Sequence, residues 1–105
     1  MLNILLACGS GASSGFIAQS MRKASKVMGL DCQIKAVSDI EIMNYLDEID
    51  LLMIGPHIQH RFNELQEKSS LSNVVIGIID HKKYSMLDGE GILNDALELL
   101  KRKGD

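Results

Sequence analysis

The feature that most constrains this chain is an apolar segment, residues 2–8, that stops at Cys8 and is followed by a loop of glycine, alanine and serine. The segment is too short for a helix and too uniformly apolar for a strand with one exposed face. It therefore predicts a strand buried on both faces of a parallel sheet. Apolar residues then recur at helical spacing from Phe16 to Met28, and Gly29 is placed to end that helix. Cys8 is thus expected where a strand ends and a helix is about to begin.

The position of Cys8 favours chemistry with anions. Free amide groups of the loop and of the first helical turn converge there with the positive end of the helix dipole, which favours a bound phosphate and lowers the pKa expected for the thiol. An inert core cysteine beside an ordinary turn is the alternative, but the glycine-rich loop favours the functional interpretation. We take Cys8 as the candidate nucleophile, with a phosphate-binding loop formed by Gly9, Ser10, Gly11, Ala12, Ser13, Ser14 and Gly15.

Three further strands are predicted, at residues 32–37, 50–55 and 74–79, and the first of them alternates in polarity as a sheet-edge strand does. Strands that alternate with helices indicate an α/β fold, with an open four-stranded parallel sheet and helices on both faces. In such folds the site lies at the carboxyl ends of the strands. The loops expected to meet there are residues 8–15, 55–59 and 80–89.

Helix signals fall between these strands. Ser38 and Glu41 form a capping box, and the short helix that follows is expected to end near Asp47 or Glu48. Pro56 suits the first turn of the next helix, which should end before a loop at residues 69–73. A longer loop at residues 80–88 should lead into the last helix, with Asp88 as its N-cap. The side chains expected to point inward are Ile40, Met43 and Leu46 in the short helix, and Ile58, Phe62 and Leu65 in the next.

Length and charge limit the function classes. The chain has 105 residues and is expected to form a single domain, residues 1–105, that folds without metal or disulfide staples. A net charge of -3 gives no reason to expect nucleic acid as a partner. No apolar run approaches the ~18 residues of a membrane span, so we expect no direct membrane insertion.

The two cysteines fit neither a disulfide framework nor a zinc site, and reduced thiols in the cytoplasm suit them best. Cys8 would end its strand whereas Cys32 would begin a parallel one, about 17 Å away along the strands. That separation is too long for a disulfide, so Cys32 is expected to be structural.

Known phosphate sites of other classes fit poorly. A dinucleotide fingerprint would need glycine instead of Ser14. A P-loop would need a lysine at the start of the helix, but the first lysine of the chain is Lys23. A phospho-accepting receiver would need acidic residues in the first loop, which has none. A small cysteine phosphatase shares the cysteine and the loop, but its Cys-x5-Arg pattern needs an arginine where this chain has Ser14. The sequence favours a phosphoryl carrier. A phosphatase and a non-covalent anion-binding module remain the alternatives.

Three histidines and two lysines lie near the expected site loops. His57 and His60 stand one helical turn apart without a third metal ligand, and His81 is in the last loop. Surface histidines are the better interpretation, and Lys82 and Lys83 are expected to be solvated. We expect neither a metal nor another cofactor.

With these features together, the chain resembles the IIB component of bacterial phosphotransferase (PTS) sugar-uptake systems, in the lactose/cellobiose class. The likeness covers nearly the whole chain. It lies in the strand ending at Cys8, its loop without arginine, the segment 52–56 (Leu-Met-Ile-Gly-Pro) and the segment 84–89 (Tyr-Ser-Met-Leu-Asp-Gly). Two positions depart from the family pattern: Gly15 stands where serine or threonine is expected, and His57 where glutamine is usual.

The resemblance implies a fold similar to the low-molecular-weight tyrosine phosphatases, with the first strand central in the order 2-1-3-4. It also implies a phosphotransferase activity in which Cys8 takes a phosphoryl group from a phosphohistidine of the EIIA protein. Cys8 would then pass the group to a sugar bound by the membrane component EIIC, and the family likeness favours a β-linked disaccharide such as cellobiose or chitobiose. The protein would be cytoplasmic and would reach the membrane through EIIC.

Overall fold

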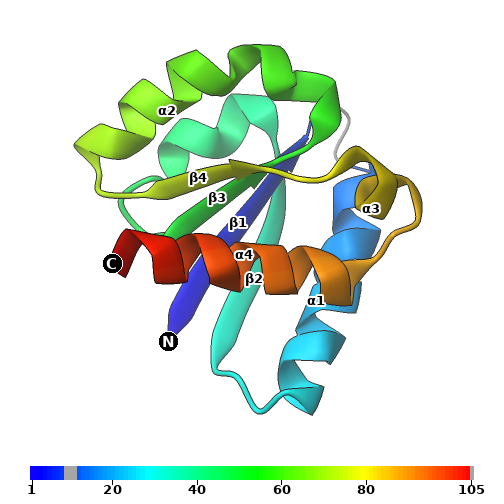
Figure 1. The fold of residues 1–105 in the computed structure, drawn as a ribbon. Coiled ribbons are helices and arrows are strands. Elements are labelled where there is room, and N and C mark those ends of the chain that lie inside the picture. Colours follow the sequence, from blue (N-terminus) through cyan, green and yellow to red (C-terminus); the bar gives the residue numbers. More distant parts are fainter. Residues whose placement is uncertain (9–11, 105) are drawn as a thin grey trace.

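The protein is built on a four-stranded parallel sheet, seen in a computed structural model that describes residues 1–8 and 12–104 (Figure 1). The strands are β1 (Leu2–Cys8), β2 (Cys32–Ser38), β3 (Leu51–Ile54) and β4 (Val75–Ile78). Their order is β2-β1-β3-β4, and every neighbouring pair is parallel. The predicted fold class and strand order are confirmed, and the first strand lies in the interior of the sheet.

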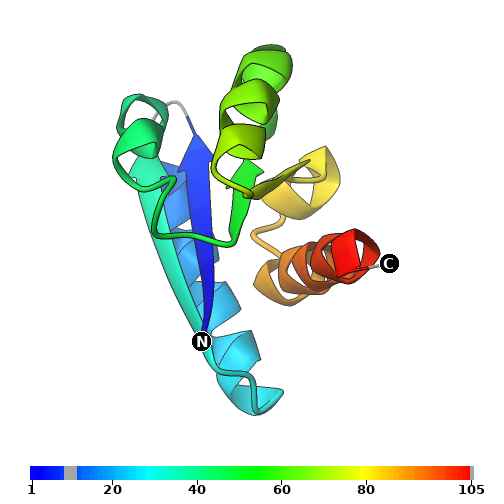
Figure 2. The same ribbon diagram turned by 90° about the vertical axis from the view of Figure 1, so that its left-hand side faces the viewer.

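Helices cover both faces of the sheet (Figure 2). One face carries α1 (Ala12–Val27) and α4 (Gly89–Gly104). The other carries the 3-10 helices η1 (Asp39–Asn44) and η2 (Pro56–Arg61), together with α2 (Phe62–Leu71). A short helix, α3 (His81–Ser85), lies at the carboxyl end of the sheet. No helix of the described part of the chain is long and apolar enough to cross a membrane.

The central strand divides the hydrophobic core into two clusters. Ile4 and Leu6 pack with α1 and α4, whereas Leu5 and Ala7 pack with η1, η2 and α2. All four side chains are buried, as expected for a parallel strand that is covered on both faces. The unbroken apolar run of residues 4–8 therefore follows from burial on both sides.

The first short helix turns a different face inward from the one predicted. Ser38 and Glu41 do form the capping box, but the helix is a 3-10 helix that ends at Asn44. Ile40 is 82% exposed and Met43 is also exposed, whereas Ile42 and Leu46 are buried. The prediction for Ile40 and Met43 was wrong because it assumed 3.6 residues per turn, and the tighter 3-10 winding changes which side chains share a face.

Two predicted loops are partly helical. The helix after Pro56 consists of η2, which has a kink at Ile58, and of α2, which continues to Leu71, three residues into the loop predicted at 69–73. The loop predicted at residues 80–88 contains α3, whose N-cap is Asp80. The Asp80 side chain accepts a hydrogen bond from the Lys83 amide at 3.1 Å. This capping interaction stabilises a helix of only five residues that the apolar pattern did not reveal.

The two cysteines lie at opposite ends of the sheet. Cys8 is paired in register with Ser38, at the end of β2, while Cys32 at the start of β2 is paired with Leu2. Both residues are thiols rather than halves of a disulfide, as predicted. Gly29 has a φ of 71°, a left-handed conformation that favours glycine, and it follows α1 where the helix was expected to end.

Candidate functional site

Cys8 is the last residue of β1 and sits at the carboxyl edge of the sheet, between the ends of β2 and β3. It is 1% exposed. The neighbouring strand end is held close, because the Gly55 amide donates a 2.8 Å hydrogen bond to the carbonyl oxygen of Ala7. Cys8 is therefore held in place by its position on the central strand.

The α1 helix begins shortly after Cys8, as the sequence predicts. Residues 9–11 lie outside the described residues, and so do the side chains of Ala12, Ser13 and Ser14, which form the first turn of α1. Gly15 is exposed, and a Cβ built on it would have no neighbour within 4 Å. The first turn carries no acidic residue, so the positive end of the α1 dipole has no carboxylate of its own helix opposing it. The role of this loop in holding phosphate stays a prediction.

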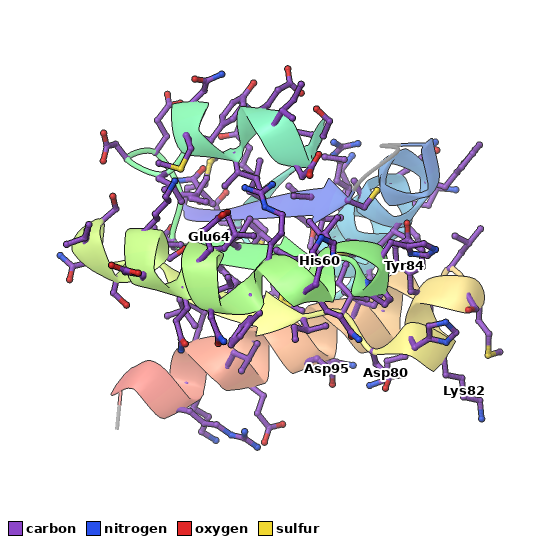
Figure 3. All side chains as sticks on the ribbon, turned by 90° about the horizontal axis from the view of Figure 1, so that it is seen from above. His60, Glu64, Asp80, Lys82, Tyr84 and Asp95 are labelled. Carbon is purple, nitrogen blue, oxygen red and sulfur yellow. The ribbon has the colours of Figure 1, made fainter. Side chains whose placement is uncertain are left out.

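Gly55 and Tyr84 form the wall beside Cys8. A Cβ built on Gly55 would lie 3.0 Å from the Cys8 Cβ and 3.4 Å from Cε2 of Tyr84, so glycine is what allows the two side chains to approach. Tyr84 belongs to α3 and is 7% exposed. It appears at this end of the sheet in Figure 3. The three loops predicted to meet at the carboxyl edge therefore do meet, through Cys8, Gly55 and Tyr84.

His57 adds an aromatic contact to this wall. Its ring centroid lies 5.5 Å from that of Tyr84, with the two planes tilted by 50°. This geometry is that of an aromatic pair, and it helps to orient the Tyr84 ring over Gly55. His60 lies farther along η2, and His81 begins α3. Among the described residues, no group of three histidine, cysteine or acidic side chains could hold a metal ion.

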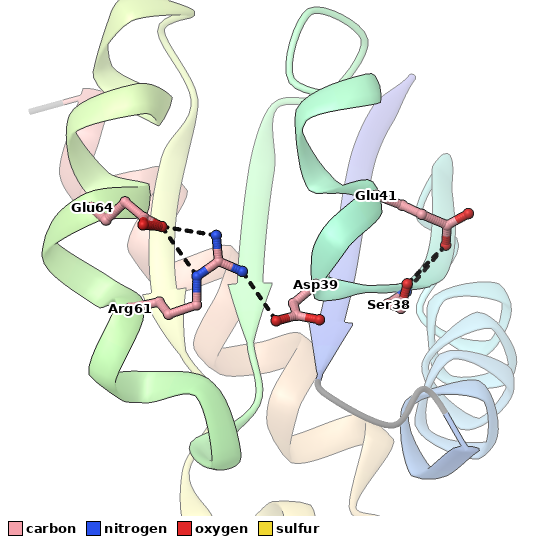
Figure 4. Close-up of polar contacts among 5 residues, drawn as sticks. All are labelled: Ser38, Asp39, Glu41, Arg61 and Glu64. Carbon is pink, nitrogen blue, oxygen red and sulfur yellow. Dashed lines mark hydrogen bonds and ion pairs between the residues drawn. The ribbon is translucent and has the colours of Figure 1, made fainter.

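An ion-pair cluster joins η1 to η2 at the same edge of the sheet (Figure 4). Nη1 of Arg61 lies 3.0 Å from Oδ2 of Asp39, and Nη2 of Arg61 lies 2.8 Å from Oε1 of Glu64. The hydrogen bond to Glu64 raises the pKa of Arg61 and lowers that of Glu64. Asp39 directly follows the strand end opposite Cys8, so the cluster stabilises the segments that flank the site on one face.

This cluster was not predicted from the sequence. The spacing of Arg61 and Glu64 is typical of an i, i+3 pair on a helix, and it could have been found. Asp39 is 22 residues away in the chain, and nothing in the local pattern connects it to Arg61.

The two lysines of α3 differ in their surroundings. Lys83 donates to Oδ2 of Asp95 at 2.7 Å, and this hydrogen bond raises its pKa. Lys82 is exposed and is labelled at the outer side of α3 in Figure 3. Asp88 accepts a 3.0 Å hydrogen bond from the Gly91 amide at the start of α4, which confirms its role as the N-cap. Asp88 therefore caps α4, and Lys83 forms an ion pair with Asp95 of α4.

Cys32 differs from Cys8 in its position and reactivity. Burial raises the pKa of the Cys32 thiol, and the nearby negative charge of Asp31 adds to the effect. At neutral pH the thiol is therefore protonated, and the thiolate that reacts with electrophiles is scarce.

We expect iodoacetamide to alkylate Cys32 more slowly in the native protein than in urea, because unfolding removes the burial that raises its pKa. The native rate should rise about tenfold per pH unit up to that raised pKa, in step with the thiolate fraction. Mass spectrometry of the Cys8→Ser variant measures this without interference from the other thiol. Equal native and unfolded rates at pH 7 would contradict the described environment of Cys32.

Comparison with known proteins gives one consistent result. The family "PTS system, Lactose/Cellobiose specific IIB subunit" matches residues 3–95. The oligo-beta-mannoside-specific EIIB component of Bacillus subtilis is 31% identical over 95% of this chain and 97% of its own length. The cellobiose-specific EIIB component of Lactococcus lactis is 30% identical over 92% of this chain and 94% of its own length.

Solved structures agree with the sequence comparisons. The cellobiose-specific IIB protein of Borrelia burgdorferi superimposes with a TM-score of 0.79 at 26% identity, covering 97% of this chain and 94% of that one. The lactose-specific IIB domain of Streptococcus pneumoniae superimposes with a TM-score of 0.84 at 15% identity, covering 92% and 95%. A YwlE mutant from Bacillus subtilis, of the low-molecular-weight tyrosine phosphatase type, has a TM-score of 0.53 at 12% identity, covering 95% and 94%. The predicted likeness to the phosphatase fold is confirmed at the level of the fold.

Some relatives contain this domain within a longer chain. The lactose-specific EIICB component of Streptococcus mutans is 24% identical over 94% of this chain, and the match covers 18% of that protein. In that relative the EIIB and EIIC parts share one polypeptide.

Proposed function

The chain belongs to the lactose/cellobiose-specific IIB family of the sugar phosphotransferase system, and on that premise we propose that Cys8 is its phosphoryl carrier. The observation that supports this is the position of Cys8, at the carboxyl end of an interior strand and just before the amino end of α1. Amide groups there can hold phosphoryl oxygens without a metal ion. As a component of a phosphotransferase, the domain needs one nucleophile that forms and breaks a bond to phosphorus.

The proposed relay has two in-line displacements at phosphorus. In the first, the Cys8 thiolate attacks the phosphorus of a phosphohistidine on EIIA. The S–P bond forms, the P–N bond breaks, and its electron pair stays on the imidazole. In the second, a hydroxyl oxygen of the sugar held by EIIC attacks the same phosphorus. The S–P bond then breaks to regenerate the thiolate, and the hydroxyl proton leaves to a base. Loop amides of residues 9–15 are proposed to balance the charge in both steps.

The EIICB relatives support EIIC as the acceptor-side partner, because in them the two components are covalently joined. We propose that this domain works at the membrane surface through EIIC and receives its phosphoryl group from EIIA. The relatives named for oligo-beta-mannoside, galactose and cellobiose are 31%, 30% and 30% identical to this chain. Because the identity is nearly equal for relatives named for different sugars, it fits a phosphoryl carrier whose sugar pocket lies in EIIC. We propose a β-linked sugar such as cellobiose as the final acceptor.

A cysteine phosphatase is the second candidate, because the YwlE-type structure shares the fold. The two candidates differ in what happens to the phosphoryl group. A phosphatase holds its phosphocysteine briefly, because an arginine of its loop assists the attack of water. The loop of this chain has Ser14 at that position. We therefore expect the phosphocysteine to persist until an acceptor arrives.

The test is intact-protein mass spectrometry after incubation with phosphoenolpyruvate, the general PTS proteins and an EIIA of the lactose/cellobiose class. One added phosphoryl group is expected, and it should remain after the donors are removed. It should disappear when EIIC vesicles and cellobiose are added. Steady release of inorganic phosphate from an aryl phosphate, with no stable phosphoprotein, would instead support the phosphatase.

Gly55→Ala should slow phosphoryl acceptance from EIIA by about tenfold, because the new Cβ displaces Cys8 or Tyr84 by a few tenths of an ångström. Gly55 has a φ of -68°, which alanine adopts without strain, so a separate backbone effect is not expected. Rapid-quench phosphorylation measures the rate, and urea unfolding of the same variant provides the control for stability. An unchanged rate would show that the wall does not position the thiol.

A further inference from the structure

The ring of Tyr84 belongs to the wall beside Cys8, but the helix that carries it is too short to hold it there by itself. Helix α3 has five residues, fewer than an isolated helix needs to be stable in water. Asp80 caps its first turn, and the chain leaves it through Leu87, whose φ of 54° is unfavourable for a residue other than glycine. The position of α3 must therefore depend on contacts with the rest of the protein.

One such contact comes from the segment that follows β3. Gly55 lies next to both Cys8 and Tyr84. His57 follows two residues later, and Pro56 restricts the backbone between them. The His57 ring pairs with that of Tyr84, with 5.5 Å between the ring centroids. One short segment therefore both borders the thiol and holds the aromatic ring beside it.

The other contact comes from α4. Nζ of Lys83, the residue before Tyr84, lies 2.7 Å from Oδ2 of Asp95. Asp95 is in the middle of α4, a helix whose apolar side packs in the core, and Figure 3 shows it close to Asp80 at the start of α3. The carboxylates of Asp80 and Asp88 also act on the Lys83 charge, and they would attract it if Asp95 were removed. Asp95 therefore decides which way Lys83, and with it α3, is drawn.

We propose that His57 and Asp95 are positioning residues of the phosphoryl-transfer site, and that both hold the ring of Tyr84 in its wall. His57 acts on the ring directly, whereas Asp95 acts through Lys83 and α3. The inference rests on the proposed role of Cys8 as phosphoryl carrier. Each residue limits how far the wall can move, and a fixed wall keeps the thiolate aligned with the incoming phosphorus.

Variants of His57 test the direct contact. His57→Ala should slow phosphoryl acceptance from EIIA about threefold, because the aromatic pair with Tyr84 is lost. His57→Phe should keep the wild-type rate, since phenylalanine supplies the ring without the charge or the hydrogen bonds of histidine. If His57→Phe is as slow as His57→Ala, the histidine acts through its polar atoms and its proposed role is overturned.

Variants of the ion pair test the indirect contact. Asp95→Lys should slow acceptance about threefold, because it places two cations side by side. The exchanged pair Lys83→Asp/Asp95→Lys should restore the rate, and failure to restore it would overturn the role of Asp95. Glu98→Gln is the matched control and should keep the wild-type rate, since it removes a charge of α4 whose partner, Arg102, is on the same helix.

A Tyr84→Leu background shows whether both residues act through this ring. His57→Ala and Asp95→Lys should cause no further loss of rate in that background, because the group that they position is gone. Losses that add to that of Tyr84→Leu would overturn the proposal and indicate direct contacts with EIIA. Circular dichroism verifies that each variant is folded.

Nuclear Overhauser effects provide a readout that needs no phosphoryl transfer. Those between the ring protons of Tyr84 and the α-protons of Gly55 should weaken in His57→Ala and in Asp95→Lys, and persist in Glu98→Gln. Unchanged effects in both variants would overturn the inference whether or not Cys8 is the carrier. Weakened effects in a protein whose wild type accepts no phosphoryl group would instead count against the proposed function and leave the hold on Tyr84 supported.

Discussion

Cys8→Ser should reduce phosphoryl acceptance from EIIA by on the order of a thousandfold or more, to the background of the assay. The serine hydroxyl has nearly the same size but is protonated at neutral pH, so it cannot replace the thiolate as a nucleophile. The side chain is buried at the end of an interior strand, and the substitution should leave the fold unchanged. Intact-protein mass after the phosphoenolpyruvate-driven reaction measures the loss.

Cys32→Ser is the matched control. Cys32 lies at the opposite end of the sheet with a raised pKa, and its replacement should leave phosphoryl acceptance at the wild-type level. If Cys8→Ser still accepts a phosphoryl group, the nucleophile is another residue. If neither variant nor the wild type accepts one from an EIIA that phosphorylates a known EIIB, the non-covalent anion-binding alternative gains support.

Leu6→Ala should lower the free energy of unfolding by about 2–5 kcal/mol, a large part of the roughly 5–15 kcal/mol of a small domain. Leu6 is fully buried on the interior strand, between Ala36 of β2 and Met53 of β3, and it packs toward α1 and α4. Parallel strands on either side hold its backbone, so the surroundings cannot collapse into the cavity. The urea midpoint should fall with an unchanged m-value.

Val27→Ala provides the comparison for this loss. Val27 also lies in a regular element but is 88% exposed, so its truncation should change the free energy of unfolding by less than about 0.5 kcal/mol. A loss below about 1 kcal/mol in Leu6→Ala would mean that α1 and α4 can move in to fill the cavity.

Much of the fold was predictable because apolar runs reflect burial. The four strands were found within one or two residues, and the position of Cys8 followed from where its run stops. The meeting of the three site loops followed from the rule that parallel strands end at one edge. This prediction is confirmed, because Gly55 lies next to both Cys8 and Tyr84.

The errors arose where tertiary contacts decide the local structure. Ile40 was expected in the core and is exposed, because η1 has 3-10 geometry. Helix α3 is held by the Asp80 cap and by Tyr84 packing beside Gly55, and neither interaction produces a periodic apolar pattern. The pairing of Asp39 with Arg61 depends on two 3-10 helices that only the folded sheet brings together. The role of the loop at residues 9–15 stays a prediction, because residues 9–11 and the side chains of residues 12–14 lie outside the described part of the chain.

The placement of α4 beside α1 has a consequence for folding during synthesis. Among the described residues, the cluster on the η1 and α2 face has no member beyond Ile76, so it can pack before α4 emerges from the ribosome. The opposite cluster needs Ile92, Leu93 and Ala96 of α4, which are synthesised after its other strands and helices. Until then Ile4, Leu6 and Met21 lack their final cover and are available to chaperones. The domain therefore gains its two cores one after the other, and the helix that follows Cys8 is secured only when α4 packs against it.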